Sequence, residues 1–116
     1  MTMYDRWTDR ARKIMQLANQ EAMRLGHGNI DTAHILIACV KEGSGVAAYA
    51  LKEAGIYSLQ HMRDELEKIL PACEVVVPFG KLPQSPRVRE AVVAANAYAE
   101  YRGDCFVGTE HLLVGI

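Results

Sequence analysis

The chain has 116 residues, of which half are apolar and 23% are charged, and its formal net charge is −1. This composition is typical of one globular domain or part of one, and the near-zero charge provides no basic surface for nucleic acid. No apolar run approaches the roughly 20 residues of a membrane span. The N-terminus lacks the apolar core of a signal peptide, and three cysteines without a CxxC pair (Cys39, Cys73, Cys105) indicate reduced thiols in a cytoplasmic protein.

The first predicted helix begins after Thr8, a hydroxyl residue suited to an N-cap, and stops at Gly26. Apolar residues recur between these points at steps of three and four, as on one side of an amphipathic helix. Most polar side chains, Glu21 among them, fall on the other side. The apolar stripe comprises Ala11, Ile14, Met15, Ala18, Ala22 and Leu25.

The second helix is predicted to start with Asp31 or Thr32 as its cap. Residues 35–40 are continuously apolar, which is typical of a buried helix. A buried strand is the competing interpretation of so short a run. The cap before the run and Lys41-Glu42-Gly43 after it favour the helix.

Two shorter helices and a long connection follow. Ser44 is predicted to start a third helix rich in small residues, and Ser58 to cap a fourth that Pro71 ends. Residues 72–84 then form a linker. Its Val75-Val76-Val77 has strand propensity but no partner strand, so we expect an extended loop.

The last part of the chain restarts the helical pattern. Ser85-Pro86 is a cap followed by proline at the first helical position, where its missing N–H does no harm. Gly103 ends this fifth helix, and Thr109 opens a sixth.

An internal repeat relates the two ends of the chain. Thr32 and Thr109 are 77 positions apart, and so are His34 and His111. Matches in one register over so long a stretch indicate duplication of a structural unit. The same offset relates Arg10 to Arg87, Arg12 to Arg89, Ala18 to Ala95, Asn19 to Asn96, Ala22 to Ala99 and Gly26 to Gly103.

The repeat divides the chain into a first unit at about 8–71, the linker at about 72–84, and a partial second unit at 85–116. The prediction is an all-α fold of two four-helix units about a pseudo-twofold axis, with the second unit truncated. The two histidine-bearing turns are expected to face one another across that axis. A truncated repeat leaves apolar surface uncovered, so we expect self-association or reduced stability.

Several separated motifs resemble the N-terminal domain of Clp-family AAA+ unfoldases, the ClpC/ClpA branch in particular. They are residues 4–12, the two T-x-H-[IL]-L helix starts, and residues 42–48 and 82–87. The resemblance implies a non-catalytic module that docks adaptors and tagged or unfolded substrates for an ATP-dependent unfoldase and its Clp peptidase. No GxxxxGK[ST] motif is present, so ATP and magnesium would bind in modules outside these residues.

The resemblance also implies a binding site at the start of the sixth helix. The acidic residue of a ClpC-like T-E-H start is associated with phosphorylated arginine, and here it is Glu110. Its carboxylate would grip the guanidinium, while the Thr109 hydroxyl and backbone amides would donate to phosphate. The alternative is that Glu110 favours its helix dipole and Thr109 caps. The first copy has Ala33 at the glutamate position, so its site is expected to be lost unless Asp31 substitutes.

His34 and His111 are predicted to be structural rather than metal ligands, because no third ligand has suitable spacing. Each is expected to be buried at its helix start, with a hydrogen bond to backbone across the repeat interface, and Thr32 is grouped with them as structural. His27 reads as a surface or cap residue.

Tyr4, Trp7 and Arg10 are candidates for an adaptor-binding surface near the N-terminus. Packing against the first helix is the alternative for both aromatic residues, and simple solvation is the alternative for the arginine. Two other functions remain as rivals: a stand-alone accessory protein of a Clp peptidase, and a helix-turn-helix DNA binder. The absence of a basic recognition helix argues against the second. No nucleophile–base pair or carboxylate dyad points to an enzyme.

Overall fold

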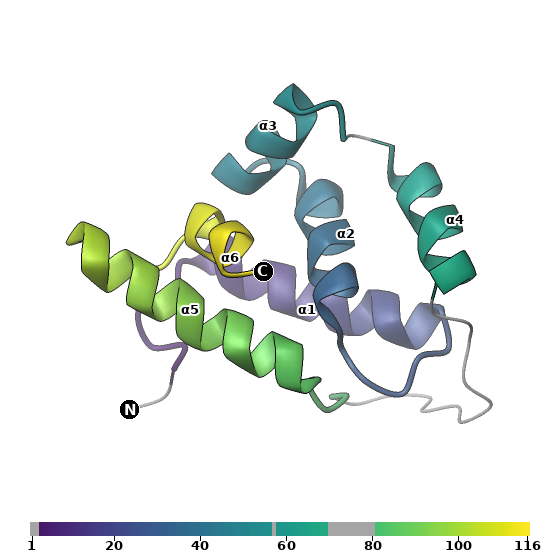
Figure 1. Cartoon of the computed structure of the whole chain (residues 1–116), viewed down its shortest axis with the longest axis horizontal. Coiled ribbons are helices and arrows are strands. Elements are labelled where there is room, and N and C mark those ends of the chain that lie inside the picture. The colour runs from purple at the N-terminus through teal and green to yellow at the C-terminus, as the bar shows by residue number, and fades with distance from the viewer. Residues whose placement is uncertain (1–2, 57, 70–80) are drawn as a thin grey trace.

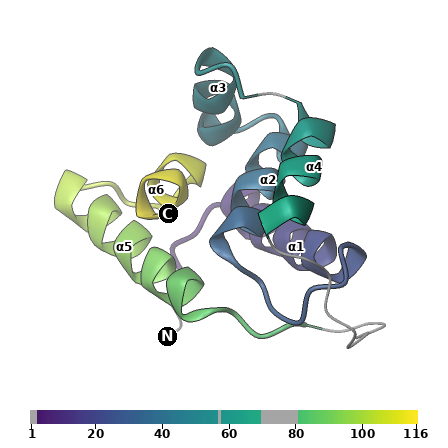
Figure 2. The same cartoon turned by 45° about the vertical axis from the view of Figure 1, so that its right-hand side comes forward.

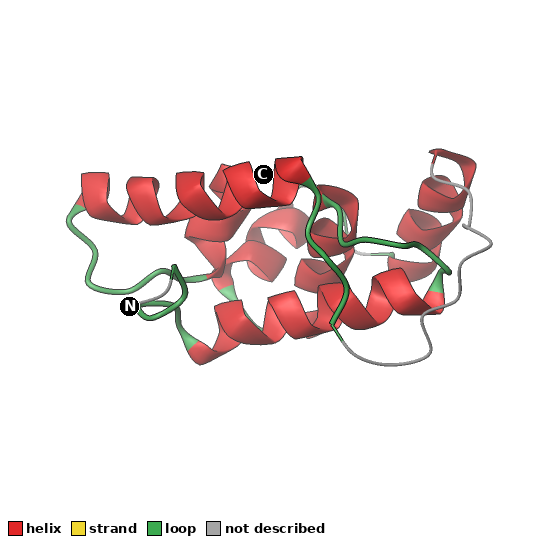
Figure 3. Cartoon of the chain, turned by 90° about the horizontal axis from the view of Figure 1, so that it is seen from below, coloured by secondary structure: helices red, strands yellow, loops and turns green. Residues whose placement is uncertain are grey.

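The computed structural model describes residues 3–56, 58–69 and 81–116. All regular elements within these ranges are helices (Figure 3), which confirms the all-α prediction. None of these helices combines the length and apolar character needed to cross a membrane. The predicted end at Pro71 and the loop at Val75–Val77 lie outside the described residues. The helices are α1 (Asp9–Arg24), α2 (Thr32–Glu42), α3 (Val46–Glu53), α4 (Leu59–Ile69), α5 (Pro86–Arg102) and α6 (Thr109–Gly115).

The helices form two groups. The α1 helix packs on α2, and α5 packs on α6 in the same way. The α3 and α4 helices both lie against α2, and α3 also contacts α6 (Figure 1). The long helices α1 and α5 run in opposite directions (Figures 1 and 2).

The ends of the long helices confirm the predicted capping signals. Thr8 Oγ1 accepts a hydrogen bond from Ala11 N at 3.2 Å, and Ser85 Oγ accepts one from Val88 N at the same distance. Gly26 and Gly103 stop α1 and α5 with φ of 74°, a value that disfavours any residue with a β-carbon.

The structure also identifies the N-cap residues of α2 and α3. Asp31, not Thr32, is the N-cap of α2. The N-cap of α3 is Gly45 rather than Ser44, because the Ser44 hydroxyl and amide both donate to the Glu42 carboxylate. Glu42 also accepts from Gly45 N at 2.9 Å, so this carboxylate ties the turn before α3 to the end of α2.

Glu21 lies in the core, not on the polar side of α1 as predicted. Its side chain is 1% exposed, and its Oε1 lies 2.6 Å from Arg63 Nε on α4. The periodicity places Glu21 outside the apolar stripe, but α4 folds over this position and supplies a cation. A buried carboxylate needs such a partner, so this ion pair positions α4.

The two groups are joined by a reciprocal pair of backbone contacts. Trp7 pairs with Val107 in a parallel β-bridge, and Ile30 pairs with Gln84 in another. The offset of 77 converts the first pair into the second. The segment before α1 therefore meets the segment before α6, and the segment before α5 meets the segment before α2, as an approximate twofold relation requires. The bonds are Thr8 N to Val107 O, Val107 N to Arg6 O, Ile30 N to Pro83 O and Ser85 N to Ile30 O, all 2.8–2.9 Å.

Candidate functional site

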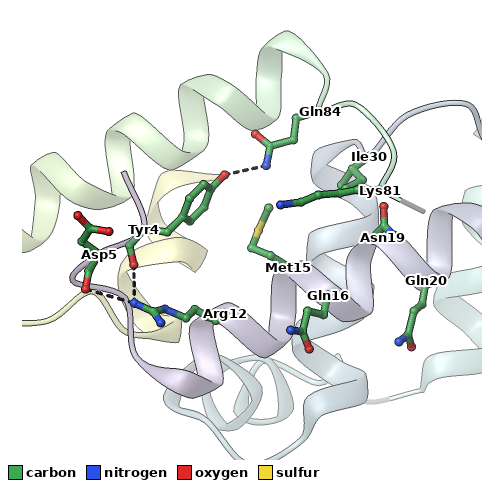
Figure 4. Close-up of a pocket in the computed structure, with 10 residues that line it drawn as sticks. All are labelled: Tyr4, Asp5, Arg12, Met15, Gln16, Asn19, Gln20, Ile30, Lys81 and Gln84. Carbon is green, nitrogen blue, oxygen red and sulfur yellow. Dashed lines mark hydrogen bonds between the residues drawn. The ribbon is translucent and has the colours of Figure 1, made fainter. Parts of the chain in front are cut away.

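An open groove of about 610 Å³ runs along one side of α1. The N-terminal segment forms one wall, and the segment that leads into α5 forms another (Figure 4). The partly exposed Met15 gives it apolar surface, the buried Ile30 lies at its floor, and four amide side chains give it hydrogen-bonding capacity. The lining residues are Tyr4, Asp5, Arg12, Met15, Gln16, Asn19, Gln20, Ile30, Lys81 and Gln84.

Internal hydrogen bonds fix the walls of this groove. Arg12 Nη2 donates to the carbonyl oxygens of Tyr4 at 3.0 Å and Asp5 at 3.2 Å, which ties the N-terminal segment to α1. Gln84 Nε2 donates to the Tyr4 hydroxyl at 2.7 Å and so links the two walls (Figure 4). Asn19 Oδ1 accepts from Leu82 N at 2.8 Å on the opposite side.

The groove was not predicted from the sequence, although Tyr4 was singled out. One signal was available: Asn19 and Asn96 repeat in register, and a repeated amide on a helix indicates a shared structural role. In the structure, Asn19 holds the segment that enters α5. The groove itself depends on contacts between segments more than 60 residues apart, which periodicity does not report.

Trp7 and Arg10 do not join Tyr4 in this groove. Trp7 is 3% exposed and packs its ring edge-to-face against Tyr4 at 4.9 Å, so packing and not surface exposure describes it. Its buried Nε1 has no hydrogen-bond partner in the described part of the chain. Arg10 is exposed on α1, and its charge helps to lower the pKa of Glu42. Partial burial alone would raise that pKa, but the hydrogen bonds from Ser44 and Gly45 outweigh it.

The start of α6 lies against the start of α3. Thr109 is 3% exposed, and its Oγ1 accepts a hydrogen bond from Ala47 N at 3.1 Å, so the hydroxyl serves α3 and not its own helix. Gly45 approaches closely: a β-carbon there would lie 2.7 Å from Thr109 Oγ1. Glu110 is 43% exposed beside this contact, with one oxygen 3.5 Å from His111 Nδ1.

The equivalent carboxylate in the first unit is committed to internal bonds. Asp31 Oδ1 accepts from Thr32 N at 2.7 Å and from the Ser85 hydroxyl at 3.2 Å. It therefore caps α2 and ties it to the start of α5. Ala33 offers no second carboxylate at this turn.

Both predicted structural histidines are buried, and each accepts a backbone bond at the start of its own helix. Asp31 N donates to His34 Nδ1 and Gly108 N donates to His111 Nδ1, both at 2.8 Å. The prediction placed these backbone partners across the repeat interface. The structure places them at the N-caps, because the rings fold back over the first turn as in a capping box.

The other ring nitrogens contact the loop after the preceding helix. His34 Nε2 lies 2.6 Å from His27 Nδ1, and His111 Nε2 lies 2.7 Å from Asp104 Oδ2. His27 and Asp104 are again 77 positions apart. His27 was predicted to be a surface or cap residue; at 7% exposed it is not at the surface.

The histidine turns do not face one another. Each ring points to a residue of its own unit, and the start of α6 meets α3 rather than α2. Burial, with the neighbouring His27 adding to it, lowers the pKa of His34 to about 4. No group of three or more potential metal-ligating side chains occurs among residues 3–56, 58–69 and 81–116.

Comparison with known proteins identifies relatives over almost the whole chain. Chaperone protein ClpB from Oceanobacillus iheyensis is 39% identical over 114 residues, and ClpC/MecB, a negative regulator of genetic competence from Bacillus subtilis, is 39% identical over 119 residues. Each match covers 98% of this chain but only 14% of the relative. The chain therefore spans a small part of the length of these relatives.

Solved structures show the same fold. The N-terminal domain of ClpD from Arabidopsis thaliana superimposes with a TM-score of 0.79 at 20% identity, over 98% of this chain and 77% of that one. The ClpV N-domain in complex with a VipB peptide gives 0.75 at 11% identity, over 97% and 68%. The family described as the Clp repeat (R) N-terminal domain matches residues 6–116. By its sequence, its fold and its paired helix starts, this chain belongs to the Clp repeat N-terminal domain family.

Proposed function

We propose that this chain is the substrate- and adaptor-recognition domain of an ATP-dependent Clp unfoldase subunit, acting in the cytoplasm and not catalytic itself. The groove along α1 is the observation that carries the proposal. ATP- and magnesium-dependent steps would belong to modules outside these 116 residues.

The chemistry of the groove suits an extended peptide. The partly exposed Met15 can receive an apolar side chain, while the amides of Gln16 and Gln20 can bond peptide backbone. Arg12 and Lys81 add positive charge to the lining. That the ClpV N-domain has been solved with a VipB peptide supports peptide capture as a use of this fold.

A finer proposal concerns phosphorylated arginine at Glu110. The half-exposed carboxylate can bind a guanidinium, and a phosphate oxygen can accept from nearby amides. The Thr109 hydroxyl accepts from Ala47 N and retains one proton to donate. Because Asp31 is committed to Thr32 and Ser85, we expect one such site and not two.

Calorimetric titration with a phosphoarginine peptide tests the finer proposal. The wild type should bind with one-to-one stoichiometry, Glu110→Ala should weaken binding at least tenfold, and Glu100→Ala should not, since Glu100 is an exposed glutamate on α5. Equal binding by Glu110→Ala and wild type would remove the Glu110 site.

A second titration tests the groove itself with an unmodified, acidic and apolar peptide. Tyr4→Ala should weaken this binding, while Glu110→Ala should leave it unchanged. If Tyr4→Ala binds the peptide as the wild type does, the groove is not the recognition surface.

We also infer that α5 and α6 are the first two helices of a second four-helix unit, equivalent to α1 and α2. Self-association through exposed apolar side chains is part of this proposal. Val46 and Tyr49 on α3 and Val114 on α6 are all more than half exposed on helices that touch. Sedimentation that is independent of concentration would contradict self-association.

A further inference from the structure

The two capping histidines have different partners at equivalent positions. In the first unit, two imidazole rings meet inside the protein, with 7% of His27 and 1% of His34 exposed. In the second unit, a carboxylate from Asp104 meets His111. Equivalent helices surround the two pairs, so we expect the pairs to differ mainly in how they respond to protonation.

The hydrogen bonds of the first pair require both rings to be neutral. His34 Nδ1 accepts from Asp31 N, so the proton of a neutral ring lies on Nε2 and is donated to His27 Nδ1. A proton added to His34 would occupy Nδ1 and remove the cap bond. A proton added to His27 at Nδ1 would set two N–H groups against each other at 2.6 Å.

In the second pair, carboxylates surround the histidine and can stabilise the positive charge of its protonated form. A proton added to His111 would also occupy Nδ1 and remove the bond from Gly108 N, but the charged ring keeps its Nε2–H bond to Asp104 and has the Glu110 carboxylate 3.5 Å from Nδ1. Arg102 contacts the same carboxylate oxygen of Asp104, with 3.5 Å between Nε and Oδ2. Opposite charges therefore hold this pair together after protonation.

The first pair is also connected to the junction between the units. His34 holds the amide of Asp31, and the carboxylate of Asp31 accepts from the Ser85 hydroxyl. Ser85 Oγ in turn accepts from Val88 N at the start of α5. The second unit has Gly108 in place of Asp31 and cannot extend the same chain of bonds to Thr8.

Other charged groups near His34 act against burial. Glu21 on α1 and Asp31 at the start of α2 favour a protonated ring, but burial and His27 outweigh them. Glu21 is itself paired with Arg63 on α4, which reduces its effect on the pKa of His34.

We propose that the His27–His34 pair is an acid-sensitive latch that joins the end of α1 to the start of α2 and, through Asp31 and Ser85, the start of α5. Protonation opens the latch and loosens these helix starts, while in the second unit Asp104 and Glu110 hold the charged ring of His111 in place. Because the closed pair resists protonation, the free energy that holds this part of the recognition domain closed falls progressively below about pH 6.5, the ordinary pKa of histidine.

Amide hydrogen exchange by NMR, corrected for the intrinsic pH dependence, tests the latch. Between pH 7.5 and pH 5, the equilibrium constant for opening of the amides at the start of α2 and at Val88 should rise roughly 30-fold. This is the factor expected when opening exposes one histidine that then titrates with its ordinary pKa. Opening at the start of α6 should change less than threefold. An unchanged α2, or an equal response in α2 and α6, would overturn the proposal.

Reciprocal variants make the comparison independent of any single substitution. His27→Asp gives the first unit the arrangement of the second and should abolish the acid response at α2. Asp104→His should transfer that response to α6. If both variants fold and neither moves the response, the latch does not exist; if one fails to fold, the other and the wild-type comparison still decide.

Discussion

The carboxylate of Glu110 lies against the α-carbon of Gly108, and both of its oxygens are 2.8 Å from the point that a β-carbon would occupy. Glu110 thus fills space that the side chain of residue 108 would otherwise need. In the first unit, the position equivalent to Gly108 is Asp31, and the position equivalent to Glu110 is Ala33. The carboxylate of this turn is therefore on the N-cap residue in the first unit and two residues later in the second.

This exchange has different consequences in the two units. The shorter side chain of Asp31 is bonded to Thr32 and Ser85, so it serves the fold. The longer side chain of Glu110 stays half exposed. We expect Gly108→Asp to displace the Glu110 carboxylate and weaken phosphoarginine binding at least as much as Glu110→Ala does. Unaltered affinity of Gly108→Asp would show that the position of the carboxylate over Gly108 does not matter.

Stability should fall on acidification because His34 is held neutral. The folded-state pKa of about 4 lies below the ordinary value of 6.5, so the unfolded chain binds the proton more readily. The stabilising contribution is complete above pH 6.5 and is lost as the pH falls toward 4. Linkage predicts a loss of about 2 kcal/mol between pH 7.5 and pH 5 from this residue.

Urea unfolding at several pH values measures this loss. His61→Ala is the matched control, since His61 is exposed on α4 and its removal should leave the pH dependence unchanged. A free energy of unfolding that stays constant from pH 7.5 to pH 5 would contradict the role assigned to His34.

Removing only one partner of the ion pair between Glu21 and Arg63 should destabilise the protein strongly. Arg63→Ala leaves the buried carboxylate of Glu21 with only the exposed Arg24, whose Nη1 is 3.9 Å from Oε1, and we expect a loss of about 3 kcal/mol in the free energy of unfolding. Replacing both residues together, Glu21→Gln with Arg63→Met, should recover most of that loss. Lys68→Ala, which breaks an exposed pair with Glu65, should change stability by less than about 0.5 kcal/mol. Equal effects of Arg63→Ala and Lys68→Ala would show that burial of Glu21 is not important.

The contact between Gly45 and Thr109 should tolerate no β-carbon. Gly45→Ala would place that carbon 2.7 Å from Oγ1 and 3.0 Å from Cγ2 of Thr109, which is itself buried and cannot move freely. We expect a loss of about 1–3 kcal/mol, as for other overpacked sites, and separation of α3 from α6. Gly28→Ala is the control, because its β-carbon would have no neighbour within 4 Å. A thermal midpoint for Gly45→Ala equal to that of Gly28→Ala would disprove the steric argument.

Local signals in the sequence predicted the helices well. Thr8 and Ser85 cap their helices through their own hydroxyls, and Gly26 and Gly103 end them, because these effects act within one turn. The 77-residue offset also gave the equivalence of the two units, which the paired β-bridges of the structure display.

Tertiary contacts account for what the sequence did not predict. Glu21 is buried because α4 brings Arg63 to it from 42 residues away, and Thr109 caps α3 from 62 residues away. The groove needs the segment before α5 to lie beside α1. Neither helical period nor capping preference carries information about such distant neighbours, so the candidate site could be predicted only in part.

The two cysteines within the described residues should differ sharply in reactivity. Cys39 is buried in the core, where burial and, to a lesser extent, the nearby Glu42 raise the pKa of its thiol to about 12, whereas Cys105 is exposed. Because the thiolate is the reactive form, an alkylating reagent at pH 8 should label Cys105 in the folded protein and Cys39 only after unfolding in urea. Peptide mapping by mass spectrometry distinguishes the two sites, and Cys105→Ser shows whether residual labelling comes from Cys39. Labelling of Cys39 at the rate of Cys105 without denaturant would mean that α2 opens readily, and the core described for this domain would be wrong at its centre.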